Sequence, residues 1–126
     1  NANQNPITNH YLGDTGNNSI GYYSDGNVYL NNASVATFTT YTSGDVISMH
    51  VNHVLKKVWW RKNAGGWNND IMANQNPDLG IGGISFAVVK DPVWPAVDTE
   101  GATGVITANF GATAYTETPT VTSGNW

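Results

Sequence analysis

The side chains best suited to chemistry in this chain are aromatic residues set among amides and glycines. Trp67 lies in the run Gly65-Gly66-Trp67-Asn68-Asn69. A flat indole can cover the C–H face of a sugar ring while asparagine side chains donate to and accept from its hydroxyls. Trp67, Asn68 and Asn69 are therefore candidate sugar-binding residues. The alternative is that Trp67 anchors its own long loop to the fold.

Three further residues join this candidate binding set. Trp59 and Arg61 alternate with Trp60 along one predicted strand, so they face the side of the sheet opposite to Trp60. Trp59 either packs beneath the long loop or lies exposed on the sheet. Tyr22, like Trp67, has either a binding role or a structural one. Arg61 belongs to a group of cations that would meet an anionic glycan or an acidic subunit, or would form a solvated strand face. That group is Lys56, Lys57, Arg61 and Lys62.

Catalytic and metal-binding patterns are weak throughout the sequence. Only two glutamates are present, Glu100 and Glu117, and no serine-hydrolase or zinc-protease motif occurs. His50 and His53 are three residues apart, which places them on opposite faces of a strand. The segment from Asp14 to Asn18 lacks the glycine and terminal glutamate of an EF-hand calcium loop. We expect no enzyme, no catalytic residue and no cofactor, although a structural calcium site built from distant loops stays open.

Composition narrows the class of protein. The 126 residues fit one domain, charged residues make up 11%, and the formal net charge is −4. This negative net charge argues against nucleic-acid binding, which normally needs a basic surface. Cysteine is absent, which excludes disulfides and thiolate metal sites. No apolar run is long enough for a membrane helix. Abundant Asn, Thr, Tyr and Trp are typical of an extracellular β module or a virion surface protein.

Short alternating segments separated by turns predict an all-β, antiparallel two-sheet sandwich. Residues 1–18 are expected to be an irregular lead-in, and residues 19–126 a single sandwich domain of about nine short strands. Trp60, Phe86 and Phe110 are predicted to be core residues, and Trp94 to lie in the core or at a sheet edge. A loop spans Asn63 to Gly83, and loops of this length are usually functional or partly disordered. The predicted strands cover residues 20–23, 28–30, 35–41, 46–51, 56–61, 84–89, 104–110 and 114–118, with an extended segment at 92–97.

Several short motifs occur in an order that resembles SPRY domains. The motifs are Gly44-Asp45-Val46-Ile47, Val58-Trp59-Trp60-Arg61-Lys62-Asn63, Trp94-Pro95-Ala96-Val97 and Thr107-Ala108-Asn109-Phe110-Gly111. The segment around Gly65 to Asn69 is similar to SPRY-like segments of bacteriophage and prophage proteins. The resemblance covers about residues 11–126. It implies a concanavalin-A-like sandwich, and it implies one or two further strands ahead of Tyr11, where only ten residues precede.

The resemblance gives three expectations of function. The first is a bacteriophage virion surface component, such as a tail fibre, tail-tip or capsid-surface protein, which serves host attachment or virion assembly. The second is a carbohydrate-binding module of a secreted or cell-surface bacterial protein, and the third is a peptide-binding SPRY adaptor domain. Expected partners are neighbouring virion subunits, or a glycan or protein of the host surface. Because edge strands are missing, we expect an oligomer or a larger polypeptide, with no membrane insertion.

Overall fold

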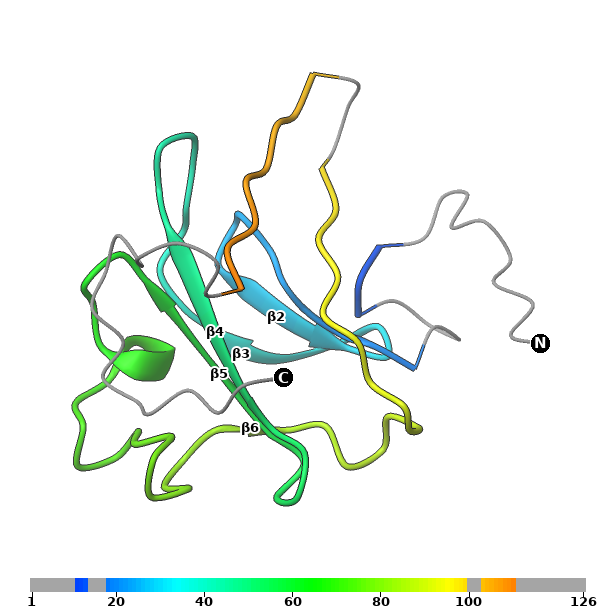
Figure 1. The fold of residues 1–126 in the computed structure, drawn as a ribbon, viewed down its shortest axis with the longest axis vertical. Coiled ribbons are helices and arrows are strands. Elements are labelled where there is room, and N and C mark those ends of the chain that lie inside the picture. The colour runs from blue at the N-terminus through cyan, green and yellow to red at the C-terminus, as the bar shows by residue number, and fades with distance from the viewer. Residues whose placement is uncertain (1–10, 14–17, 100–102, 111–126) are drawn as a thin grey trace.

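Two antiparallel three-stranded sheets make up the strand structure of the described residues (Figure 1). The computed structural model describes residues 11–13, 18–99 and 103–110. The first sheet has the order β1-β2-β3 and the second the order β4-β5-β6. The prediction of an all-β, antiparallel fold in two sheets is confirmed. The elements are β1 (Ile20–Tyr22), β2 (Asn27–Leu30), β3 (Ala33–Thr37), β4 (Ile47–Asn52), β5 (Lys57–Lys62), the one-turn 3-10 helix η1 (Trp67–Asn69) and β6 (Ile84–Ser85).

Turn chemistry fixes the hairpins of the first sheet. Gly26 has φ +94° between β1 and β2, and the Asp25 carboxylate accepts the backbone N–H of Asn27 at 2.9 Å. Asn31 and Asn32 both adopt positive φ between β2 and β3. Asparagine tolerates this conformation better than other residues with a Cβ, so two asparagines close the hairpin. These turns lie where the sequence predicts them.

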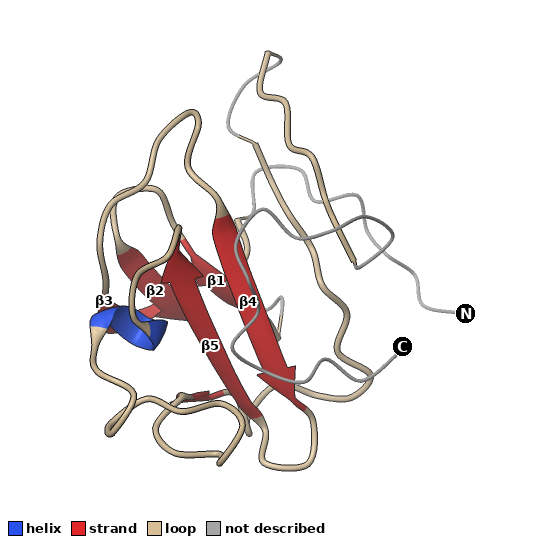
Figure 2. Ribbon diagram, turned by 60° about the vertical axis from the view of Figure 1, so that its left-hand side comes forward, coloured by secondary structure: helices blue, strands red, loops and turns tan. Residues whose placement is uncertain are grey.

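The core lies between the two sheets. Its buried members are contributed by β2, β5 and the segment after β6: Val28, Val58, Trp60, Phe86 and Val89. Figure 2 shows the β4–β5 pair lying across the first sheet. Val58 and Trp60 are two residues apart on β5, so both side chains point to this core. The predicted core positions of Trp60 and Phe86 are confirmed, at 6% and 1% exposure.

The second face of β5 is covered by the long loop. Trp59 and Arg61 alternate with the core residues and are also buried, at 0% and 7% exposure. The central strand of the second sheet is therefore buried on both faces over its middle four residues. The loop from Asn63 to Gly83 folds back over this face, and η1 contacts β5.

β6 is shorter than the predicted strand at 84–89, and backbone conformation explains why its pairing with β5 stops at each end. Ile84 and Ser85 pair with Val58 and Lys57. Gly83 before them has φ +80°, and Lys56 at the end of the partner strand has φ +52°. Both values lie outside the β region, so the ladder stops after two pairs.

The predicted strand at 104–110 is wrong, and so are two core assignments. Phe110 is 67% exposed and Trp94 is 76% exposed. Neither the extended segment at 92–97 nor residues 104–110 join a sheet within the part of the chain that the structure describes. Alternation gives a segment strand propensity, but a strand also needs an edge to pair with. Several predictions concern residues that the structure does not describe. They are the lead-in through residue 10, residues 14–17 of the calcium-like segment, Glu100, Glu117 and the predicted strand at 114–118.

Candidate functional site

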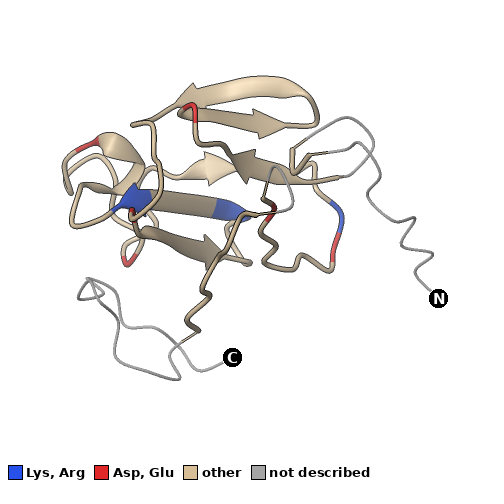
Figure 3. Cartoon of the chain, turned by 90° about the horizontal axis from the view of Figure 1, so that it is seen from above, with Lys and Arg blue, Asp and Glu red and all other residues tan. Residues whose placement is uncertain are grey.

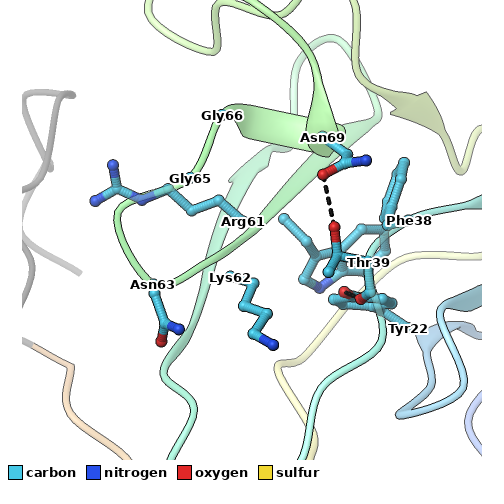
Figure 4. Close-up of a pocket in the computed structure, with 10 residues that line it drawn as sticks. Tyr22, Phe38, Thr39, Arg61, Lys62, Asn63, Gly65, Gly66 and Asn69 are labelled. Atoms are coloured by element: carbon cyan, nitrogen blue, oxygen red, sulfur yellow. Dashed lines mark hydrogen bonds between the residues drawn. The ribbon is translucent and has the colours of Figure 1, made fainter.

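A pocket of about 150 Å³ opens where the first sheet, β5 and the long loop meet. Figure 4 shows the Thr39 and Asn69 side chains pointing toward each other next to the Tyr22 and Phe38 rings, with Asn63, Gly65 and Gly66 on the other side. Its walls come from β1, from the segment after β3, from the end of β5 and from the start of the loop. The lining residues are Tyr22, Phe38, Thr39, Trp60, Arg61, Lys62, Asn63, Gly65, Gly66 and Asn69.

Aromatic rings form one wall of the pocket. The Tyr22 ring lies 5.5 Å from Phe38, 5.0 Å from Tyr41 and 6.1 Å from Trp60, measured between centroids. The first two contacts are edge-to-face, the arrangement that aromatic quadrupoles favour. Burial is the main cause that raises the pKa of the Tyr22 phenol, and the nearby Tyr41 and Asp45 raise this pKa further. Tyr22 therefore stays protonated at neutral pH, and its hydroxyl donates to the backbone carbonyl of Thr39.

Polar groups form the rim beside these rings. The Thr39 hydroxyl donates to the Asn69 side-chain oxygen at 2.7 Å, and both residues are exposed. Asn69 has φ +62° and lies directly after the buried Asn68, at the end of η1. This hydrogen bond joins the long loop to the segment that leads from β3 to β4. It also brings an amide and a hydroxyl to the mouth of an aromatic pocket.

A charged network fixes the lower rim of the pocket. The Lys62 ammonium lies 3.0 Å from the Asp45 carboxylate and donates to the Thr40 carbonyl at 3.1 Å. Asn63 donates to the other Asp45 oxygen and accepts the backbone N–H of Val46. The Thr42 backbone N–H, the Asn63 amide and Lys62 lower the pKa of Asp45 to about 2. Lys62 and Asn63 are thus held in place, and the Lys62 charge is balanced by a carboxylate.

The loop is docked on β5 by specific contacts rather than by burial alone. The Trp59 indole N–H donates to the Ile81 carbonyl at 3.1 Å. The Asn68 side-chain oxygen accepts the backbone N–H of Trp60 at 2.9 Å. This N–H lies beyond the end of β6, so the Asn68 amide supplies the hydrogen-bond partner that a longer β6 would have supplied. Gln75 then accepts from both Asn68 and the Gly83 backbone N–H. These bonds place η1, and with it Asn69, beside the pocket.

The six candidate binding residues fall into two groups. Tyr22, Arg61 and Asn69 line the pocket, although the Arg61 side chain extends away from it in Figure 4. Trp59, Trp67 and Asn68 are 0%, 3% and 7% exposed and lie under or within the docked loop. Trp67 therefore anchors its loop, as the alternative interpretation states, and no open indole face remains at Trp59 or Trp67 for a sugar.

The predicted solvated strand face of cations is not formed, because none of these four side chains is exposed, although basic positions lie at both ends of one strand (Figure 3). Lys56 pairs with Asp91, and Lys57 donates to the Gly80 carbonyl at 3.2 Å. Arg61 is buried, with its guanidinium 4.9 Å from the centre of the Trp67 ring. A guanidinium is weakly hydrated and stacks well on an aromatic face, so it can cover the anchor of the loop.

The residues of the other half of the pocket were not predicted from the sequence. Phe38 and Thr39 follow β3 in a stretch that reads as a continuation of that strand. The strand instead ends at Thr37, and the chain then crosses toward the second sheet. This crossing is what brings Phe38 and Thr39 to the loop.

His50 lies on the loop-covered face of β4 and gives the fold a pH dependence. Its ring contacts Trp59 and Trp67 edge-to-face, at centroid distances of 5.6 and 6.4 Å. Burial lowers the pKa of His50 below its ordinary value of 6.5, and the nearby Asp78 opposes this shift. The fold therefore prefers the neutral imidazole. Its contribution to stability is complete above the unfolded pKa and is lost as the pH falls through and below about 6.5.

We expect His50→Gln to flatten this part of the stability profile. Wild-type protein should lose free energy of unfolding between pH 7 and pH 5, and the variant should lose less over the same interval. The measurement is urea unfolding followed by tryptophan fluorescence at several pH values. An unchanged slope in His50→Gln would show that this histidine does not carry the effect.

The described residues contain no cluster of three or more potential metal ligands. They also contain no helix with the length and apolar character needed to cross a membrane. Comparisons with protein-family models, with curated proteins and with solved structures found no match. The pocket has an aromatic wall, an amide and hydroxyl rim, and no acidic side chain among the residues that line it.

Proposed function

We propose that the chain is a non-catalytic binding module that holds one sugar ring of a surface glycan in the pocket between Tyr22 and Asn69. The observation that carries this proposal is the pairing of an aromatic wall with an exposed Thr39–Asn69 rim. Rings can cover the C–H face of a pyranose, while the amide and hydroxyl exchange hydrogen bonds with its hydroxyls. The volume of about 150 Å³ suits one small ring, since pockets for drug-sized ligands are roughly 300–1,000 Å³.

The biological setting that we propose is the surface of a bacteriophage virion. Four ordered motifs resemble SPRY domains, and the segment around Gly65 to Asn69 resembles SPRY-like segments of phage proteins. Two antiparallel sheets around one core are compatible with a concanavalin-A-like sandwich. In a tail fibre, tail tip or capsid-surface protein, such a module attaches the virion to its host or contacts a neighbouring subunit. Loops on a rigid β scaffold suit either contact.

Two features support a binding role without catalysis. Glycosidases generally need two carboxylates that face each other across the substrate, and no carboxylate lines this pocket. The Asp45 carboxylate behind the rim is occupied by Lys62, Asn63 and the Thr42 backbone N–H, so it is committed to structure.

A secreted bacterial carbohydrate-binding module would use the same pocket and the same chemistry. It differs from the virion component only in its source, so binding data alone do not separate the two. A peptide-binding adaptor is less well supported, because an extended peptide needs several adjacent subsites.

We expect Asn69→Ala to reduce sugar binding at least tenfold, since it removes the amide from the rim. The measurement is a glycan array probed with the purified chain, followed by titration with the best ligand. Asn74→Ala is the matched control, because Asn74 lies in the same loop, outside the pocket, and its amide bonds to Asp70. Equal loss in both variants, or no binding of any glycan by the wild-type chain, would contradict the proposal.

A further inference from the structure

His50 lies among the contacts that hold the long loop on the β4–β5 hairpin. Trp67 of the loop and Trp59 beneath it are both buried. The His50 ring on β4 contacts both indoles edge-to-face, at centroid distances of 5.6 Å from Trp59 and 6.4 Å from Trp67. His50 therefore contacts both the strand that carries the loop and the loop itself. A charge on this imidazole acts directly on the contact between the two.

The face of the hairpin beneath the loop already carries two cations. Lys57 and Arg61 alternate with Trp59 along β5, so their side chains lie on this face. Lys57 donates to a loop carbonyl, and the Arg61 guanidinium lies 4.9 Å from the centre of the Trp67 ring. β4 adds no charged side chain besides His50, and β6 adds none. A protonated His50 would be the third positive charge on this face.

The loop offers little negative charge in return. Its charged side chains are Asp70 and Asp78. The Asp70 carboxylate accepts the Ile71 backbone N–H at 2.7 Å and the Asn74 amide at 3.1 Å, so its bonds stay within the loop. Asp78 favours the charged imidazole of His50, but burial has the larger effect and lowers the His50 pKa. The docked loop therefore disfavours protonated His50, whereas an open loop leaves it in water.

The core does not depend on these contacts. Val58 and Trp60 point to the core from the other face of β5, and six residue pairs join β4 to β5 without the loop. The loop can therefore leave this face while the sheets stay paired. Opening exposes Trp59 and Trp67 to water, which is costly, so the open loop is a minor state at neutral pH.

We propose that protonation of His50 opens the long loop, which carries Asn69 away from Thr39 while the two sheets stay folded. Acid thereby makes the rim of the pocket labile. The consequence for sugar binding rests on the proposed function, whereas the opening itself does not. The open loop binds the proton more tightly than the docked loop. The open population therefore rises as the pH falls through and below the ordinary histidine pKa of 6.5.

Hydrogen exchange of the Trp60 amide in low urea tests the proposal. This N–H is bonded to the Asn68 side chain of the loop, so it exchanges when the loop opens. After correction for the intrinsic pH dependence of exchange, we expect its protection to fall about fivefold or more between pH 7.5 and pH 5. Its exchange should depend on urea much less than that of the most protected sheet amides, because loop opening exposes less surface than unfolding. No fall with acid, or the full urea dependence of unfolding, would overturn the proposal.

Three variants assign the proton to its residue. His50→Gln and His50→Phe cannot be protonated at this position, and the phenyl ring keeps an aromatic contact with both indoles. Either variant should show nearly the same Trp60 protection at pH 7.5 and pH 5. His53→Gln is the matched control, because it removes the exposed histidine that follows β4, and it should behave like wild type. A fall that persists in the His50 variants, or that disappears in His53→Gln, would contradict the role of His50.

A sugar added at pH 5 separates this proposal from the proposed function. A sugar held between Thr39 and Asn69 binds only the docked loop, so it should restore Trp60 protection. The probes are the methyl glycosides of glucose, galactose, N-acetylglucosamine and rhamnose. Acid-dependent opening that no glycoside reverses would support the His50 proposal and contradict the sugar site. Protection by a glycoside at pH 7.5, without any acid-dependent opening, would contradict the His50 proposal alone.

Discussion

Replacing Trp59 by alanine is expected to cost about 3–5 kcal/mol of unfolding free energy, which is the usual range for a fully buried tryptophan. The side chain is 0% exposed between β5 and the long loop. Its removal deletes the ring contact with His50 and the hydrogen bond from the indole to the Ile81 carbonyl. The surrounding loop cannot fill the space, because it is held by its own hydrogen bonds at Asn68 and Gln75.

Trp94→Ala is the control for this change. It removes the same side chain from a position that is 76% exposed, so its cost should stay within about 0.5 kcal/mol. Urea unfolding followed by circular dichroism measures both variants independently of the lost fluorophore. Similar costs for the two variants would contradict the burial of Trp59 beneath the loop.

Replacing Gly83 by alanine is expected to cost about 2–4 kcal/mol, for two separable reasons. Gly83 has φ +80°, which any residue with a Cβ adopts at a cost. A Cβ at this position would also lie 2.6 Å from two atoms of the Trp59 ring. The ring is fully buried and cannot move aside, so the loop itself must shift.

Gly44→Ala isolates the first reason. Gly44 has φ +90°, and a Cβ there would meet no atom within 4 Å, so only the conformational cost of about 1–2 kcal/mol applies. In a Trp59→Ala background the clash disappears, and Gly83→Ala should then cost no more than Gly44→Ala. This coupling is measured by a double-mutant cycle in urea. Additive costs in the cycle would show that Gly83 and Trp59 are not in contact.

The first sheet and the β4–β5 hairpin were predictable because local chemistry specifies them. Asp25 and Gly26 fix one turn, and Asn31 and Asn32 fix the next. Alternation along β5 correctly separates the core residue Trp60 from Trp59 on the opposite face. What alternation could not decide was whether Trp59 is covered, because that depends on how a loop of glycine and asparagine folds back.

The C-terminal half was less predictable for the same physical reason. Residues 104–110 alternate as well as β3 does, yet Val105 is 89% exposed and Phe110 is 67% exposed. Strand pairing is a property of two segments, and one segment's pattern does not reveal whether a partner edge is available. The pocket was half predictable: Tyr22 and Asn69 could be named from residue type, but the crossing that brings Thr39 to Asn69 depends on where β3 ends.

We propose that the rim and wall between Tyr22 and Asn69 form a sugar site. The most direct measurement is a titration of isotope-labelled chain with methyl glycosides of glucose, galactose, N-acetylglucosamine and rhamnose, followed residue by residue by NMR. We expect saturable shift changes at Thr39 and Asn69 and at their neighbours around Tyr22 and Gly66, for at least one glycoside. Shift changes confined to other surfaces, or none with any of the four sugars, would contradict it.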